Sequence, residues 1–208
     1  MTTPTNITIQ THALCTVPLF SAPLPGYDAQ RRQSLKRLIL DLRQQQPGLA
    51  VSNRYGWHSD RDLHLRKDED IVWLIGRLGP FLRSCLESVH PDFKQANAMM
   101  TSCWANVSER QAWNEPHSHL PSHWSGVFYV AAQDSVNASD PTDKSGSIEF
   151  MNPIPLGKAY GASASYWVKP QDGLALLFPA NVMHFVHPNL TDTTRISIAF
   201  NLDIAFAA

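Results

Sequence analysis

Three of the nine histidines in the chain, His117, His119 and His123, fall within seven residues of one another. His117 and His119 are separated by one residue, so on an extended backbone their side chains point to the same side. Neutral imidazole is a common ligand of first-row transition metals. This spacing predicts half of a metal site, whose remaining ligand must come from a distant part of the chain.

The C-terminal third of the chain offers two histidines for that position, His184 and His187. His184 opens an alternating segment, and His187 falls on the opposite face of the same segment. Arg195 lies eleven residues after His184, and Ser197 shares its strand face two residues further on. The region therefore supplies a histidine that could ligate a metal and, one hairpin further along the chain, the positive charge of Arg195 beside the hydroxyl of Ser197.

Length and composition limit the kinds of partner this chain can have. Its 208 residues suffice for one domain with a substantial core, and the net charge of -1 gives no basic surface for nucleic acid. The N-terminus lacks the basic head and apolar core of a signal peptide, and no apolar run approaches the roughly 20 residues that cross a bilayer. Three widely spaced cysteines favour reduced thiols. We expect a cytoplasmic protein with neither nucleic-acid nor membrane partners.

The elements that must position these residues change in character along the chain. A first strand is expected within residues 13–24, followed by amphipathic helices over 27–46 and 68–89, with a kink or break at Gly79-Pro80. From residue 96 the pattern is β, and the predicted strands cover 96–107, 125–131, 146–151, 166–169, 174–178, 184–187 and 195–202. The order predicts a mainly β double-stranded β-helix, or jelly roll, with two N-terminal helices packed outside. We expect one domain over residues 1–208, in which 1–95 support a metal-bearing core at 96–208.

Over about residues 100–203 the chain resembles the iron(II)- and 2-oxoglutarate-dependent oxygenases. It is most similar to the small bacterial and phage group of 2OG-Fe(II) oxygenases. The matching positions are Trp104 to Asn106, Asn114, His117 to His119, residues 125–130, 146–150 and 170–179, His184, and residues 195–201. Their order and spacing together carry the resemblance, since no single motif is decisive.

The resemblance implies an iron(II) held by three protein ligands on one face, leaving three positions open. The usual first motif in the family is His-x-Asp or His-x-Glu, whereas this chain has His117-Ser118-His119. A three-histidine site of His117, His119 and His184 is therefore implied, because His187 suits the spacing to Arg195 less well. Two alternatives remain: water replaces His119, or Glu115 supplies a carboxylate.

The resemblance also implies a role for the arginine and hydroxyl that follow the last histidine. Arg195 and Ser197 match the family residues that hold the far carboxylate of 2-oxoglutarate, which a planar guanidinium can grip with two hydrogen bonds. Ser125 and Tyr129 share one strand face and are expected to reach the same carboxylate.

The expected reaction uses Fe(II), 2-oxoglutarate and O2. A small polar or amino-acid-like substrate would be hydroxylated through a ferryl intermediate, with succinate and CO2 as co-products. A halogenase fits less well, because the third ligand position carries a bulky histidine rather than a small residue.

Two other functions remain open from the sequence. One is a cupin-type three-histidine dioxygenase or isomerase that does not use 2-oxoglutarate, although it leaves Arg195 and Ser197 without a role. The other is a non-catalytic jelly-roll binding module. The sequence also leaves a homodimer open.

Several further residues are candidates for the surroundings of the site. Segments 55–67, 133–144 and 153–163 are expected to form the pocket mouth. The remaining candidates could contact substrate or could be plain structural residues; they are Asn106, Asn114, Trp113, Trp124 and Glu149. The lone His58, His64 and His90 are expected to be ordinary surface or core residues.

Overall fold

The computed structural model describes residues 10, 16–89, 96–132, 140, 142–154 and 157–206. The first half contains two helices, two short strands between them and a leading strand: β1 (Phe20–Pro23), α1 (Ala29–Gln45), β2 (Asn53–Arg54), β3 (Trp57–His58) and α2 (Glu69–Val89). The second half is all β apart from one 3-10 turn: β4 (Ala96–Ser108), β5 (Trp113–His117), β6 (Trp124–Ala131), β7 (Ile148–Met151), β8 (Ser165–Val168), β9 (Leu174–Pro179), β10 (His184–Val186) and β11 (Arg195–Phe206).

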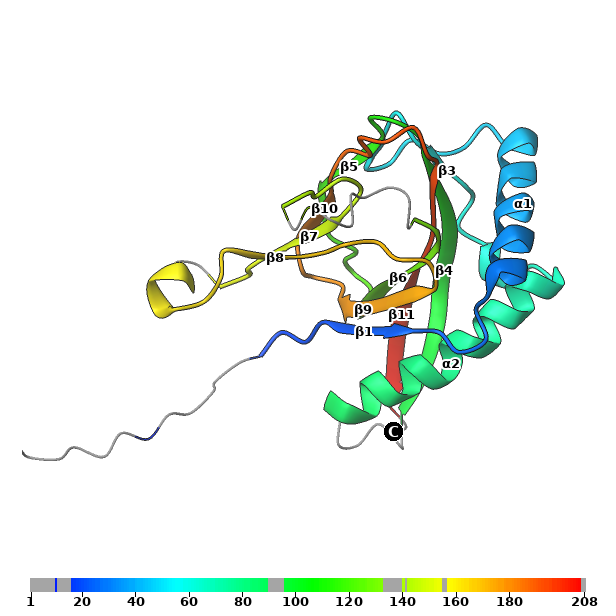
Figure 1. Ribbon diagram of the computed structural model, residues 1–208. Helices are drawn as coiled ribbons and strands as arrows, with labels where there is room; N and C mark the ends of the chain where they lie inside the picture. Colours follow the sequence, from blue (N-terminus) through cyan, green and yellow to red (C-terminus); the bar gives the residue numbers. More distant parts are fainter. Residues whose placement is uncertain are drawn as a thin grey trace, which may run out of the picture.

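The strands form two antiparallel sheets (Figure 1). The larger has six strands in the order β1-β9-β6-β11-β4-β3, and the smaller has five in the order β2-β5-β10-β7-β8. Strands distant in sequence are neighbours in both sheets, as β11 lies between β4 and β6. The predicted jelly roll is confirmed, and the short β2 and β3 add one strand to the edge of each sheet.

Both helices pack on the outer face of the larger sheet. Successive side chains of β6 point to opposite faces of the larger sheet. Phe128 and Val130 join the core under the helices, whereas Val127 and Tyr129 point between the two sheets. The predicted placement of the helices outside the jelly roll is therefore correct. It leaves the inner face of the larger sheet available to build a cavity.

Helix α2 continues through Pro80, so the expected break at Gly79-Pro80 does not occur. A proline inside a helix costs about 3 kcal/mol. Apolar residues buried on both sides of the proline hold the helix against the sheet and outweigh that cost; they are Ile71, Leu74, Leu78, Leu82, Cys85 and Leu86.

Within the described residues, no helix is both long enough and apolar enough to pass through a bilayer. Several predictions cannot be compared with the structure. His90, Cys15 and most of the 133–144 segment lie outside the described residues.

Candidate metal centre

Two of the predicted histidines lie side by side on neighbouring strands of the smaller sheet. Strands β5 and β10 are antiparallel neighbours, and His117 is paired directly with His184. His119 follows the end of β5, where its backbone N–H donates to the Ala180 carbonyl at 2.8 Å. The three side chains each offer a ligand atom, and these atoms lie within 4.8 Å of one another. Residues up to 67 positions apart thus form the cluster that the sequence predicted.

In two of these histidines, His117 and His184, the Nδ1 atom already forms a hydrogen bond with a backbone carbonyl. Nδ1 of His117 donates to the Glu115 carbonyl at 2.6 Å, and Nδ1 of His184 donates to the Val182 carbonyl at 2.9 Å. Each bond leaves the lone pair on Nε2, as in histidines that ligate metals. Nε2 of His119 lies 3.3 Å from Nε2 of His184. Two nitrogens that share a metal at about 2.1 Å each are roughly 3.0–3.4 Å apart, so the cluster fits a divalent ion.

The electrostatics of the cluster also suit a metal. Burial, followed by the nearby imidazoles, lowers the pKa of His119 to about 3, and burial likewise lowers the pKa of His184 to about 3. Burial lowers the pKa of His117 as well. The three rings are therefore neutral at pH 7, which is the form that binds a cation.

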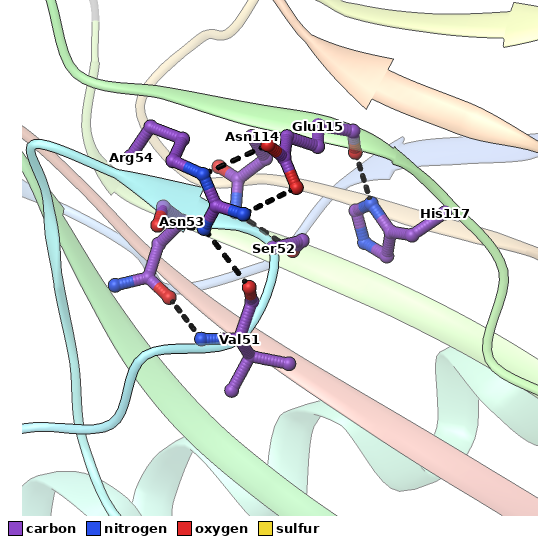
Figure 2. A network of polar contacts seen from close by, with 7 residues as sticks. All are labelled: Val51, Ser52, Asn53, Arg54, Asn114, Glu115 and His117. Atoms are coloured by element: carbon purple, nitrogen blue, oxygen red, sulfur yellow. Dashed lines mark hydrogen bonds and ion pairs between the residues drawn. The ribbon is translucent and has the colours of Figure 1, made fainter.

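Glu115 is engaged elsewhere and does not complete the cluster. Its two carboxylate oxygens accept from Nε and Nη2 of Arg54 at 2.8 and 2.5 Å, while its backbone carbonyl bonds to His117 (Figure 2). The structure thus favours His119 over Glu115 as the third candidate ligand, because a bidentate ion pair would have to break to release the carboxylate.

A buried arginine lies at the other end of the same cavity, which has a volume of about 450 Å³. Arg195 is 3% exposed, and its Nη2 donates to Ser108 Oγ at 3.1 Å, while its buried Nε has no partner among the described residues. Ser197 is also buried and is paired across the sheet with Tyr129. Burial raises the pKa of Tyr129 to about 12, so its hydroxyl stays a donor. The end of the cavity thus combines a cation with two hydroxyls.

Ser125 does not share this end of the cavity. It is paired with Asn201, six residues along β11 from Arg195, and its hydroxyl donates to the Phe200 carbonyl at 3.3 Å. Four residues of strand place Ser125 about 13 Å from Tyr129. The expectation that both hydroxyls reach one carboxylate is therefore corrected. Ser125 lines the cavity at its histidine end.

Comparisons with known proteins agree with this geometry. Residues 102–201 match the family model described as "Putative 2OG-Fe(II) oxygenase". No curated protein matches the chain by sequence. Over residues 102–201 the chain is thus similar to the 2OG-Fe(II) oxygenase superfamily. Enzymes of this superfamily use Fe(II), 2-oxoglutarate and O2, and the histidine cluster is able to hold the iron.

Solved structures share the fold of this oxygenase at low identity. A prolyl-4-hydroxylase from Pseudomonas putida is 14% identical, with a TM-score of 0.63 over 90% of this chain and 93% of its own. HygX from Streptomyces hygroscopicus, solved with nickel, 2-oxoglutarate and hygromycin B, is 13% identical, with a TM-score of 0.62 over 90% and 83%. A prolyl hydroxylase from Trichoplax adhaerens, in complex with a peptide fragment, is 14% identical, with a TM-score of 0.62 over 89% and 83%.

Two residues at the mouth of the oxygenase cavity were missed from the sequence. His58 stacks on the Trp104 ring at 5.3 Å between centroids, and Arg61 lines the cavity beside them. Both come from an irregular segment whose polar composition carries no periodic signal. The expectation that segment 55–67 contributes to the pocket agrees with this lining, and His58 is a buried residue, as expected, that also lines the cavity. Pro153, Ile154 and Ser163 instead line a second cavity.

The remaining candidates divide between the oxygenase cavity and structural positions. Asn106 and Asn114 line the cavity. Trp124 packs in the core beneath the helices, and Trp113 does not line the cavity. His123 is also structural, because its Nδ1 accepts the backbone N–H of Ile204 at 2.9 Å.

Glu149 is neither exposed nor in the cavity. It is 7% exposed and accepts from Lys144 at 2.8 Å and from the Ser165 hydroxyl. The ring of His187 completes this cluster through Nε2, 2.6 Å from Glu149 Oε2. His187 therefore has a structural partner away from the metal cluster.

Proposed function

We propose that this chain is a 2-oxoglutarate-dependent dioxygenase whose metal is held by His117, His119 and His184. The observation that carries the proposal is one cavity with three neutral imidazoles at one end and a buried guanidinium at the other. When bound, the iron supplies the activation of O2. The protein residues supply binding, orientation and charge.

Arg195 is proposed to bind the far carboxylate of 2-oxoglutarate, with Ser197 and Tyr129 as hydroxyl partners. Ala199 is paired with Trp104, whose ring lies 5.7 Å from that of His119, so Ala199 marks the metal end of β11. Arg195 lies four residues away, or about 13 Å along the strand. An arginine side chain and a five-carbon diacid together span such a gap. Nε of Arg195, which is buried and has no hydrogen-bond partner among the described residues, supports the presence of an anion there.

The proposed reaction is hydroxylation of a small polar or amino-acid-like substrate, with release of succinate and CO2. A cavity of about 450 Å³ that must also hold 2-oxoglutarate favours a small molecule. Polar groups in the cavity lining favour a polar one, because Asn106 and Asn201 each have a buried carbonyl oxygen without a donor among the described residues.

Succinate production tests this function. The iron-loaded protein is incubated with 2-oxoglutarate and O2, and succinate is followed by NMR. We expect iron-dependent succinate formation that is lost in Arg195→Met and kept in Arg110→Met, whose guanidinium pairs with Asp192 on the surface. Absence of succinate from the iron-loaded wild-type protein would contradict the proposal.

A second candidate function is a three-histidine dioxygenase that needs no 2-oxo acid. The observation that favours it is the absence of a carboxylate from the histidine cluster among the described residues. Iron-dependent O2 consumption that does not respond to 2-oxoglutarate would select this alternative.

A further inference from the structure

A second guanidinium lines the cavity, and neither the metal nor the co-substrate accounts for it. Arg61 lies three residues after β3, and its backbone carbonyl accepts the Cys103 N–H at 2.9 Å, which fixes this segment against β4. Its Cζ lies 5.9 Å from the centroid of the Trp104 ring. The same ring lies 5.7 Å from the ring of His119, so the cation is one aromatic residue away from the metal cluster.

Arg61 has no carboxylate partner within the described residues, in contrast to most arginines on this surface. Ion pairs join Arg31, Arg32, Arg43, Arg54, Arg66, Arg83 and Arg110 to acidic side chains. Asp60 and Asp62 adjoin Arg61 in sequence, but neither lines the cavity. Glu115, the one acidic residue in the described lining of this cavity, is already paired with Arg54.

Charge in the loaded cavity is therefore out of balance. Three neutral imidazoles leave the double positive charge of a divalent metal uncompensated, whereas a family-type carboxylate ligand would remove one unit. The two negative charges of 2-oxoglutarate match the metal, and among the residues that line the cavity Arg195 and Arg61 then remain as two positive charges, while Asp60 and Asp62 lie outside the lining. Unlike charges in a partly desolvated cavity attract strongly, so the excess favours an anionic second ligand.

We propose that Arg61 binds a carboxylate of the substrate, so that the enzyme acts on carboxylate-bearing small molecules. The guanidinium offers two parallel N–H groups that match the two oxygens of a carboxylate. The stacked rings of His58 and Trp104 provide a flat wall for the body of the substrate between Arg61 and His119. This inference rests on the proposed function for the place of the metal, but anion binding at Arg61 does not depend on turnover.

The test follows the NMR chemical shift of the Arg61 guanidinium during an anion titration. The full chain is loaded with Zn(II) and saturated with 2-oxoglutarate, which fills the Arg195 end. Sodium acetate is then titrated while carbon-detected NMR follows the Cζ–Nε signals of the arginines. The same titration with acetamide, which has nearly the same shape but no charge, is the control. Arg66 is the internal control, because its Nε donates to Asp68 at 2.8 Å and it does not line the cavity.

We expect acetate to change the chemical shift of Arg61 in a saturable way, by at least about five times the change at Arg66. Acetamide should change the chemical shift of neither arginine. The indole N–H of Trp104 reports the same event in the variants. Its response to acetate should vanish in Arg61→Gln, persist in part in Arg61→Lys, and be unchanged in Arg66→Gln.

Three results would overturn the inference. Acetate and acetamide could move Arg61 equally, Arg61→Gln could bind acetate within twofold of wild type, or inorganic phosphate could bind Arg61 more tightly than acetate. The last result would replace the carboxylate by a phosphate. Failure of the proposed function is seen separately, because an iron-loaded protein that makes no succinate can still show the Arg61 response.

Discussion

Replacing Arg195 by methionine separates co-substrate binding from stability. The Arg195 guanidinium is 3% exposed, and burial lowers the pKa of Arg195. Nη2 donates to Ser108, while Nε has no partner among the described residues. The unliganded protein therefore carries a buried charge that no acidic side chain of the described residues offsets, and its natural partner in our account is the far carboxylate of 2-oxoglutarate.

Two opposite effects follow from this substitution. Removing one partner of a buried, hydrogen-bonded charge pair costs about 3 kcal/mol or more, which is roughly 150-fold in the Kd of 2-oxoglutarate. The unliganded chain gains instead, because methionine fills much of the same space without a desolvated charge. A gain of about 1 kcal/mol raises the Tm of a domain of this size by about 2–4 °C.

Calorimetric titration of the Zn(II)-loaded protein with 2-oxoglutarate measures the first effect, and thermal unfolding without ligand measures the second. Arg110→Met is the matched control, because it removes an exposed arginine and should change neither quantity. The reasoning is refuted if Arg195→Met binds 2-oxoglutarate within threefold of wild type. A fall of several degrees in the unliganded Tm would refute the stability argument.

Three further predictions concern the cluster and the sheets. His184→Ala should weaken Zn(II) binding by more than roughly 100-fold, whereas His187→Ala should change it less than about threefold, as measured by competition with a chelating dye. Burial acts to raise the pKa of Glu149, but hydrogen bonds outweigh it and lower the pKa to about 2 from 4.5, so the carboxylate stabilises the fold above pH 4.5 and loses this effect as the pH falls toward 2. Glu149→Gln should therefore cost about 2–3 kcal/mol in urea unfolding at pH 7 and much less at pH 3. Gly126→Ala should cost about 1–3 kcal/mol in the same assay, because the added Cβ would lie 2.3 Å from Phe200 Cζ.

The metal end of the site could be predicted because its signal is local. His117 and His119 are separated by one residue in the sequence, and the choice of His184 over His187 came from the family resemblance, which fixes the spacing to Arg195. The fold could be predicted as well, since two amphipathic helices followed by many short strands leave few architectures. The unbroken α2 could not, because its stability through Pro80 depends on tertiary packing rather than on local preference.

The register of the sheet also lies beyond what the sequence specifies. Ser125 and Tyr129 share a face, as alternation predicts, but pairing with β11 places them opposite different residues, Asn201 and Ser197. Arg61 and His58 reach the cavity only because β3 joins the edge of the larger sheet beside β4. A two-residue strand in a polar segment gives no periodicity from which this position could be inferred.

The central claim is a three-histidine metal site that binds 2-oxoglutarate. Anaerobic titration of the Fe(II)-loaded protein with 2-oxoglutarate tests it through the visible metal-to-ligand charge-transfer band. We predict that the band appears in the wild-type protein and is lost in both His184→Ala and His119→Ala. Iron that binds without producing a band would contradict the use of 2-oxoglutarate, and a band that persists with activity in His119→Ala would contradict the three-histidine site.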